Sequence, residues 1–375
     1  MRERKFLAII PTKKIGGTTT SLKEFIVYLN KKNIKTDVIC LDHQGNFELG
    51  GGLLFCENKV LKALISPKIA FQNASFKEKI KIIISYIFHH LKYEICINEL
   101  GRITDICSYE MIIAYEEGEV TKLVSHVKSC NKIAWIHCDY KRVYNKNDRN
   151  FYKKFSKIIC VSETTGNSFI ECFPELKNST VILHNLINSS QILKQSKVEI
   201  DYKKNRLLIV SLGRLDRVKQ FEKLPVIAKI LKEKGLEFEW ILIGGGNTHY
   251  KKEIMQEIDK QNVEDCFKML GEIKNPYPYI ALSDIVVCSS LSEACPFVIK
   301  ESMVLNKFIL SSNFASANEV LSGYTKCHIC ELNEFAVVIF KAFTDKLYQE
   351  TDLFDYNAYN KAEEERYDKV FMIND

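Results

Sequence analysis

The sequence lacks a hydrophobic run long enough to cross a membrane. None of the apolar stretches in its 375 residues approaches the ~18 residues that a membrane-spanning helix needs. The best run, Ile82 to Phe88, contains Ser85 and then meets His89 and His90. The chain also shows no secretory signal peptide. We therefore expect a cytoplasmic protein without an integral membrane segment.

The sequence also lacks a paired cysteine framework. Its thirteen cysteines are odd in number and scattered, which is typical of reduced thiols in a cytoplasmic protein. One CxxC, Cys327-His328-Ile329-Cys330, resembles half of a metal site, but no second pair accompanies it. A single pair only weakly indicates zinc, because a structural zinc site needs four ligands. We expect no metal site.

Charge is unevenly distributed along the chain. The net charge is +6, yet residues 1–190 hold 28 Lys and Arg against 19 Asp and Glu, or +9. Residues 191–375 hold 25 against 28, or −3. A basic N-terminal half favours an anionic partner such as a membrane surface or a phosphorylated lipid, and a lysine-rich surface without a specific partner is the alternative. Nucleic acid is disfavoured as a partner, because the lysines are dispersed and lack interleaved aromatic residues.

Length and periodicity predict two α/β domains. A chain of 375 residues is long for a single core. Its composition, 46% hydrophobic and 27% charged residues, is that of an ordinary globular protein. In both halves, short apolar runs typical of buried strands alternate with helical patterns, which indicates parallel sheets with ligands at the carboxyl ends of the strands. The strands are expected at 6–10, 36–41, 111–114, 132–136, 157–161, 180–183, 206–213, 239–243, 266–270, 284–288 and 307–311.

Two strand ends in the C-terminal half carry features suited to a diphosphate. After the strand at 206–213, Arg214 offers a planar guanidinium fork and Lys219 a point charge, a combination that suits two phosphate groups. The next strand ends in Gly244-Gly245-Gly246, and glycines at such a position let a nucleotide approach the backbone closely. For either feature alone, a solvated basic loop or an ordinary glycine turn is the alternative.

A third strand end carries two carboxylates. Glu293 and Glu301 lie eight positions apart in an otherwise apolar run. Proline suits the first turn of a helix, so we place Pro296 at the first helical position, Glu293 in the preceding loop and Glu301 in the second turn. Amides at the helix start favour an anion, and a carboxylate in the helix suits the paired hydroxyls of a ribose. Two glutamates on a surface helix are the alternative.

Taken in order, these segments resemble the retaining glycosyltransferases of the GT-B fold, family 4, of the capsular and surface-polysaccharide type. The resemblance is strongest over 206–321, where Glu293 and Glu301 match the family's E-x7-E motif, and looser in the N-terminal half. The segments that carry it are Gly213-Arg214-Leu215 with Lys219, Ile241–Gly246, Leu270–Tyr277, Ser283–Ser289 and Glu293–Glu301, with Gly16-Gly17, Ala114–Gly118, Ala134–Tyr140 and Ile159–Glu163 in the N-terminal half.

The resemblance implies an α/β architecture of the GT-B type, with two Rossmann-like parallel-sheet domains facing across a cleft. It implies an acceptor-binding domain over 1–188 and a nucleotide-sugar-binding domain over 206–350. The polar stretch 189–205 between them is predicted to be a linker. A C-terminal helix within 351–375 is expected to cross back to the N-terminal domain.

The resemblance also implies roles for individual residues. Arg214 and Lys219 would hold the donor diphosphate and stabilise the leaving nucleotide, which makes a metal or other cofactor unnecessary. Glu293 and His137 would contact the donor sugar and complete the catalytic group, although on its own His137 would more often be a buried structural histidine. The other donor-binding positions are Gly16, Gly17, Gly213, Gly244, Gly245, Ala294, Cys295, Pro296, Phe297 and Glu301, the last at the ribose, and the acceptor positions are Thr18, Glu117 and Asp139.

Two positions depart from the family pattern. Ala294 stands where the family commonly has glycine, and Cys295 stands where it has an aromatic residue. Loss of glycine narrows the conformations that the loop can adopt, so these two positions are candidates for a change in sugar choice.

The expected enzyme transfers a hexose or acetamido-hexose from a nucleoside diphosphate sugar, in the first instance a UDP-sugar, to a lipid-linked saccharide in surface polysaccharide synthesis. It would be peripherally associated with the inner face of the cell membrane. The alternatives are a non-hydrolysing sugar-nucleotide epimerase, which has two similar domains but uses no acceptor, and a degenerate transferase that acts as a partner subunit.

Overall fold

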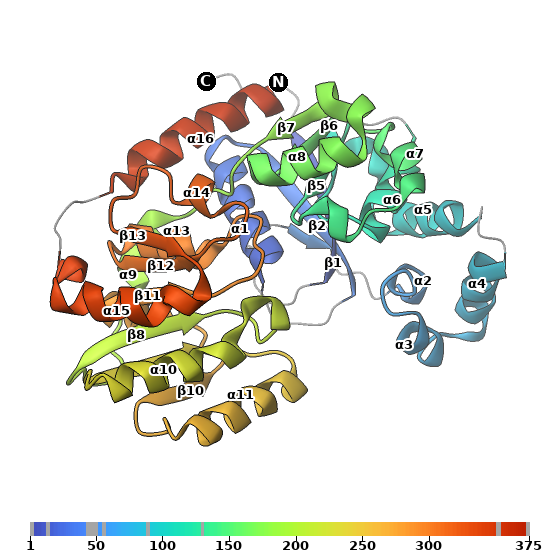
Figure 1. Cartoon of the computed structure of the whole chain (residues 1–375). Helices are drawn as coiled ribbons and strands as arrows, with labels where there is room; N and C mark the ends of the chain where they lie inside the picture. Colours follow the sequence, from blue (N-terminus) through green and yellow to red (C-terminus); the bar gives the residue numbers. More distant parts are fainter. Residues whose placement is uncertain are drawn as a thin grey trace. The chain divides into compact units, whose positions relative to one another are not determined.

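The chain folds into two compact units. The computed structural model describes residues 4–12, 16–42, 52–54, 58–87, 91–128, 131–349 and 354–372. The first unit is Met1–Leu186 with Glu363–Asp375, and the second is Ile187–Ala362. Each is built on its own parallel sheet (Figure 1). Phe88, His89 and His90, and the two ends of the expected C-terminal segment (351–353 and 373–375), lie outside the described residues.

The described part of the first unit contains a seven-stranded sheet with the order β3-β2-β1-β4-β5-β6-β7, all parallel. Its central strands are buried on both faces; Phe6 to Ile10 are at most 1% exposed. This burial explains why the strands are continuous apolar runs. Their bounds are β1 Lys5–Thr12, β2 Lys35–Asp42, β3 Gly52–Leu54, β4 Met111–Ala114, β5 Asn131–Ile136, β6 Lys157–Cys160 and β7 Thr180–Ile182.

Helices cover both faces of the first sheet. One face packs against α2, α5, α6 and α8. The other face packs against α1 and the end of α16, where the ring of Phe25 lies 5.0 Å from Trp135 and 5.1 Å from Phe371, centroid to centroid. The bounds are α1 Gly17–Lys31, α2 Lys59–Lys62, α3 Pro67–Gln72, α4 Phe76–Ile87, α5 Lys92–Ile103, α6 Glu119–Ser125, α7 Arg149–Tyr152, α8 Glu163–Cys172 and α16 Tyr356–Phe371.

The second unit has a six-stranded parallel sheet within the described residues, in the order β10-β9-β8-β11-β12-β13. Helices α10, α11 and α15 cover one face, and α12 contributes to the cover of the other. The bounds are α9 Ser189–Gln195, β8 Leu207–Leu212, α10 Leu224–Glu233, β9 Phe238–Ile243, α11 Thr248–Gln261, β10 Phe267–Gly271, α12 Tyr277–Leu282, β11 Ile285–Cys288, α13 Phe297–Val304, β12 Phe308–Ser312, α14 Ala317–Val320, β13 Cys327–Cys330 and α15 Phe335–Thr344.

The expectation of two Rossmann-like parallel-sheet domains is confirmed. All eleven expected strands are present, and the two that were not expected, β3 and β13, lie at sheet edges. In both sheets the strand order reverses beside the first strand of the unit, between β1 and β4 and between β8 and β11. Ligands of open parallel sheets bind at such switch points, outside the carboxyl ends of the strands. None of the described helices has the length and hydropathy of a membrane span.

The stretch 189–205, expected to be a linker, begins with a helix. Residues 189–195 form the helix α9, which belongs to the second unit. The side chain of Asn188 caps this helix by accepting a hydrogen bond from the N–H of Gln191 at 3.0 Å. Ile192 is buried in a cluster with Phe297 and Tyr356. The helix α9 was not predicted because its sequence is mostly polar and it buries only Ile192.

The C-terminal helix α16 contributes to both units. Its first turns belong to the second unit, where the hydroxyl of Tyr359 accepts from Lys300 at 2.9 Å. Its later turns belong to the first unit, where Asp368 accepts from Tyr28 at 2.5 Å and from Lys32 at 2.9 Å. The helix is therefore part of both cores, and the first unit is discontinuous in sequence.

The ends of β8 and β9 meet backbone to backbone at two glycines. A Cβ atom on Gly244 would lie 1.9 Å from the carbonyl oxygen of Gly213. Gly213 itself has φ +153°, and a Cβ there would lie 3.3 Å from the side chains of Lys219 and Phe221. Both glycines are thus required by the protein's own packing, whatever ligand they meet.

This contact predicts the effect of one added methyl group. Gly244→Ala forces the β8 and β9 ends apart and should destabilise the chain by about 1–3 kcal/mol, as overpacking does. The matched control is Gly101→Ala in α5, where a Cβ would meet no atom within 4 Å. Thermal unfolding should show a lower Tm for Gly244→Ala and an unchanged or higher Tm for Gly101→Ala; equal Tm values would contradict the packing described.

Candidate active site

Two loops join at the switch point of the second sheet, one after β8 and one after β11. The N–H of Leu291 donates to the carbonyl oxygen of Val218 at 2.7 Å, and the hydroxyl of Ser289 donates to that of Lys219 at 2.6 Å. In return, the amide of Gln220, a residue with left-handed backbone (φ 53°), donates to the carbonyl oxygen of Ser289 at 3.0 Å. These bonds fix the position of the Lys219 backbone.

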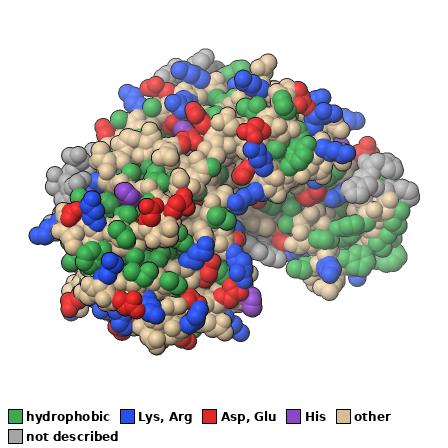
Figure 2. Space-filling view, viewed as in Figure 1, with side chains coloured by type: hydrophobic (Ala, Val, Ile, Leu, Met, Phe, Trp, Pro, Cys, Tyr) green, Lys and Arg blue, Asp and Glu red, His purple; other side chains and the backbone are tan. Residues whose placement is uncertain are grey.

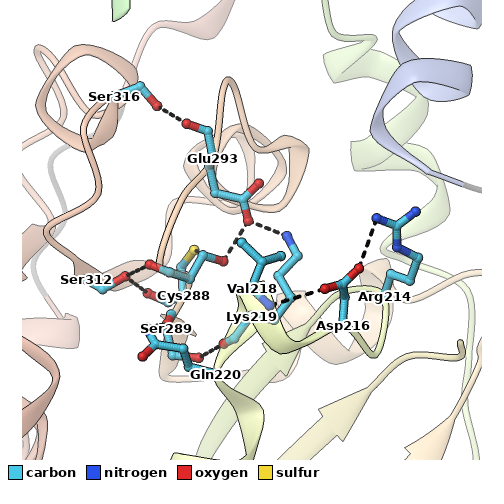
Figure 3. A network of polar contacts seen from close by, with 11 residues as sticks. Arg214, Asp216, Val218, Lys219, Gln220, Cys288, Ser289, Glu293, Ser312 and Ser316 are labelled. Atoms are coloured by element: carbon cyan, nitrogen blue, oxygen red, sulfur yellow. Dashed lines mark hydrogen bonds and ion pairs between the residues drawn. The ribbon is translucent and has the colours of Figure 1, made fainter. Parts of the chain in front are cut away.

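An ion pair between Lys219 and Glu293 connects the same two loops (Figure 3). The side chains are only 17% and 15% exposed, so both charges are largely removed from water. Ser290 donates to the Glu293 carboxylate at 2.6 Å, and Ser316 donates to the Glu293 carbonyl oxygen at 2.9 Å. The glutamate is therefore held through both its side chain and its backbone. The two serines were not among the expected site residues.

Arg214, the second cation of the loop after β8, is exposed, whereas Lys219 is largely buried. Arg214 is 67% exposed, and its Nη2 lies 3.4 Å from Oδ2 of Asp216. Asp216 also accepts from the N–H of Val218 at 3.2 Å and so caps the short 3-10 turn Arg217–Lys219. Asp216 was not predicted, although an aspartate directly before such a turn, accepting from the N–H two residues on, is a known capping pattern.

The helix after β11 begins one residue later than expected. Pro296 is the N-cap of α13 rather than its first helical residue, because its ψ of 124° is extended. Glu301 lies in the second turn as expected, and its carboxylate accepts from the hydroxyl of Tyr277 at 3.1 Å. Of the residues between, Ala294 is partly exposed, whereas the side chains of Cys295, Pro296 and Phe297 are buried. Any contact of these three with a donor would thus come mainly from their backbone.

Gly16, Gly17 and Thr18 lie at the start of α1, beyond the carboxyl end of β1. Gly16 is the N-cap residue and Gly17 is exposed. The hydroxyl of Thr19 accepts from the N–H of Gly16 at 3.1 Å and closes the first turn. In the next turn, buried Ser21 contacts the Tyr115 hydroxyl at 2.9 Å and donates to Asn185 at 2.7 Å. This polar cluster lies among the carboxyl ends of the strands.

His137 and Glu117 come together at the ends of β5 and β4. The Glu117 carboxylate accepts from the backbone N–H of His137 at 3.0 Å. The His137 ring stacks on Trp135, and its Nε2 atom is buried and makes no hydrogen bond within the described part of the chain. Burial lowers the pKa of His137 to about 3, although a hydrogen bond with the Tyr115 backbone opposes this. The imidazole is therefore neutral at physiological pH.

Asp139 has partners within its own loop. It caps the 3-10 turn Tyr140–Arg142 by accepting from the N–H of Lys141 at 3.2 Å, and it also accepts from the hydroxyl of Ser168. Burial and the neighbouring Glu117 carboxylate raise the pKa of the adjacent Cys138 thiol. Thr18, Glu117 and Asp139 all lie at the carboxyl edge of the first sheet, but Asp139 also has a structural role.

The single CxxC does not form a chelating pair. Cys327 and Cys330 belong to strand β13, and residues three positions apart in a strand point to opposite faces. No cluster of three or more His, Cys, Asp or Glu suited to a metal ion occurs among the described residues.

Residues 194–359 match the family of glycosyl transferases group 1. The match spans the strand-end loops that carry Arg214, Lys219, Glu293 and Glu301. The second unit is therefore similar to the glycosyl transferases group 1 along most of its length.

Three curated glycosyltransferases are similar in sequence. An uncharacterized glycosyltransferase of Methanocaldococcus jannaschii is 30% identical over 44% of the chain, and the match spans only 41% of that relative. The capsular polysaccharide biosynthesis glycosyltransferase CapH of Staphylococcus aureus is 28% identical over 67% of the chain and 71% of the relative. The N-acetylgalactosamine-N,N'-diacetylbacillosaminyl-diphospho-undecaprenol 4-alpha-N-acetylgalactosaminyltransferase of Campylobacter jejuni is 23% identical over 63% of the chain and 64% of the relative.

Solved structures share the GT-B fold over nearly the whole chain. HepE of Anabaena, crystallised with UDP and glucose, has a TM-score of 0.68 at 15% identity and covers 98% of the chain and 100% of its own. Sucrose-phosphate synthase of Thermosynechococcus elongatus has a TM-score of 0.71 at 12% identity, over 99% and 100%. At such identities the likeness establishes the fold alone.

The lowered pKa of His137 predicts a pH dependence. In the unfolded chain this imidazole takes up a proton near pH 6.5, whereas in the folded chain it does so only near pH 3. The resulting stability is fully present above pH 6.5 and is lost as the pH falls toward 3, by at most about 1.4 kcal/mol per pH unit.

Two measurements check this prediction. The imidazole NMR signal of His137, assigned by its absence in His137→Asn, should not titrate between pH 5 and 8. The unfolding free energy should fall less steeply between pH 6.5 and 4 in His137→Asn than in the unaltered chain. A titration midpoint near 6.5 would mean that the ring is solvated in the folded state.

Proposed function

We propose that the protein is a retaining glycosyltransferase of family 4 that transfers a hexose or acetamido-hexose from a UDP-sugar to a lipid-linked saccharide in surface polysaccharide synthesis. The observation that carries this proposal is the Lys219–Glu293 pair at the switch point of a unit that matches the glycosyl transferases group 1 along most of its length. The pair brings a largely buried cation and carboxylate together at the sheet position where parallel sheets bind nucleotides.

The donor diphosphate would bind between Lys219 and Arg214. Lys219 is held near the strand ends, and Arg214 is exposed and able to wrap a second phosphate with its planar fork. As the bond to the sugar breaks, negative charge builds up on the leaving nucleotide, and prepositioned cations stabilise that charge. We therefore propose that the reaction proceeds without a divalent metal.

Glu301 would bind the ribose and Glu293 the transferred sugar. The Tyr277 hydroxyl orients the Glu301 carboxylate, which keeps acceptor capacity for ribose hydroxyls. Glu293 is oriented by Ser290 and Ser316. In retaining transfer we assign it to positioning the sugar rather than to attack, with the acceptor approaching on the side of the departing phosphate.

The names of two relatives support the acceptor class. CapH acts in capsular polysaccharide biosynthesis, and the Campylobacter enzyme is named for a diphospho-undecaprenol acceptor. The carboxyl edge of the first sheet, with Thr18, Glu117 and Asp139, would bind the acceptor saccharide. The neutral imidazole of His137 suits hydrogen bonding to sugar hydroxyls, and a lipid-linked acceptor would keep the enzyme at the inner face of the cell membrane.

Two arginines of one loop provide a matched test. Arg214 and Arg217 are both 67% exposed, but Arg217 is paired with Glu253 at 2.5 Å. With a UDP-hexose donor and lipid-linked acceptor, Arg214→Ala and Lys219→Ala should each lower kcat/KM for UDP release by about 10- to 100-fold, the effect of losing a charged hydrogen bond. Arg217→Ala should change it less than about threefold.

Turnover that survives both Arg214→Ala and Lys219→Ala would overturn the site assignment. Product analysis separates the alternatives. An epimerase would convert the nucleotide sugar into its epimer, with no sugar transferred to an acceptor and no net release of UDP, and a partner subunit would show no turnover alone. EDTA should leave the rate unchanged.

A further inference from the structure

Helix α4 turns its apolar stripe toward solvent. Phe76, Ile80, Ile83 and Ile87 recur at spacings of four, three and four residues, so they share one side of the helix. Their exposed fractions are 79%, 41%, 44% and 67%. A helix of a globular protein normally directs such a stripe into the core. Here the stripe is only partly covered within the described residues.

The opposite side of α4 fixes it in this orientation. Ile82 is 2% exposed and belongs to the core of the first unit. Lys81 forms an ion pair with Glu99 of α5 at 2.5 Å, and the Glu99 carboxylate also accepts from Asn58 at 2.6 Å. The helix is thus attached through buried Ile82 and the Lys81–Glu99 ion pair, and the outward direction of the stripe follows from these contacts.

Helix α3 extends the apolar surface. Ile69 and Phe71 are 42% and 38% exposed. Between α3 and α4 lies a groove of about 470 Å³, lined mainly by apolar side chains that include Phe71, Ile83 and Ile87. Figure 2 shows these apolar side chains gathered over α3 and α4. We call this region, residues 67–87, the α3–α4 surface. A contiguous exposed apolar surface of this kind is typical of an interaction site.

Lysines border the apolar stripe. Lys77 and Lys79 lie on its two flanks, with the Lys79 ammonium 5.6 Å from the centre of the Phe71 ring, and Lys68 is exposed on α3. Residues 58–87 hold six lysines and one glutamate. Apolar residues on one side of a helix with lysines at its flanks are the pattern of helices that lie in a membrane interface.

We propose that the α3–α4 surface docks the protein onto an anionic lipid bilayer. The apolar stripe and the groove take up acyl chains at the boundary of the headgroups, while Lys68, Lys77 and Lys79 contact lipid phosphates. Charge selects this occupant over a second copy of the chain, since a symmetric contact would bring the same lysines together. This inference deepens the proposed function. Docking itself is argued from the surface alone, and only its purpose, access to a lipid-linked acceptor, rests on the proposed function.

Tryptophan fluorescence gives a direct test. The chain has two tryptophans, Trp135 and Trp240, and both are fully buried. Phe76→Trp therefore adds the one exposed indole. Its emission should shift to the blue with phosphatidylglycerol–phosphatidylcholine vesicles and stay unchanged with phosphatidylcholine alone. An emission that does not respond to anionic vesicles would overturn the proposal.

Vesicle co-sedimentation separates the apolar and charged contributions. Phe76→Gln/Ile83→Gln and Lys68→Glu/Lys77→Glu should each weaken binding to anionic vesicles by about tenfold or more. The matched controls are Val337→Gln, which changes an exposed apolar residue of the second unit, and Lys251→Glu/Lys252→Glu, which makes the same charge change on α11. Both controls should bind as the unaltered chain does.

Three results would contradict bilayer docking. The first is that the unaltered chain does not bind anionic vesicles. The second is that the surface variants bind as well as the controls do. The third is that the chain is a dimer in solution and that Phe76→Gln/Ile83→Gln dissociates it. The last result would assign the surface to a second copy. The vesicle assay contains no sugar donor, so the two proposals are tested independently. A chain that does not bind vesicles could still release UDP, and a chain that does not release UDP could still bind vesicles.

Discussion

The ion pair between Lys219 and Glu293 is the contact around which the strand-end loops of the second unit are arranged. Both side chains are mostly buried, and removing two charges from water costs several kcal/mol that their attraction only partly offsets. Such a pair is therefore a poor way to stabilise a fold. Its position at the switch point between β8 and β11 instead suits a ligand that takes over the ammonium, as a diphosphate would.

The surrounding structure keeps this pair in place. Gly213 leaves room for the Lys219 side chain, and Asp216 caps the turn that carries it. Gln220 adopts a left-handed backbone and ties the turn to the loop after β11. On the other side, Ser290 donates to the Glu293 carboxylate and Ser316 donates to the Glu293 carbonyl oxygen. The pair is thus prepositioned, which is the condition for stabilising charge in a transition state.

Much of the fold could be predicted from the sequence, because buried parallel strands are continuous apolar runs whose type and order follow from simple rules. The four charged residues Arg214, Lys219, Glu293 and Glu301 could be chosen because each follows a strand. Their partners Ser290 and Ser316 could not be chosen, because only the folded loops decide which hydroxyls reach Glu293. Asp216, by contrast, matches a known capping pattern and could have been found. The helix α9 was missed because its single buried residue, Ile192, leaves almost no periodic signal.

The α3–α4 surface shows a different limit of sequence reasoning. The spacing of Phe76, Ile80, Ile83 and Ile87 identifies one apolar side of a helix, but spacing does not tell which way that side faces. Burial of Ile82 and the pairing of Lys81 with Glu99 decide it, and both are long-range contacts. The spacing of these residues is typical of a helix side that packs into a core, but in the folded chain this side is exposed.

The most direct test of the donor site is the affinity of UDP measured by calorimetry for the unaltered chain, Lys219→Gln and Glu293→Gln. If the diphosphate takes the ammonium from Glu293, Lys219→Gln should weaken UDP binding by about tenfold, or 1.4 kcal/mol. Glu293→Gln should strengthen it, because a competing negative charge is removed from beside the phosphates. Equal affinities for all three proteins would contradict the placement of the diphosphate at this pair.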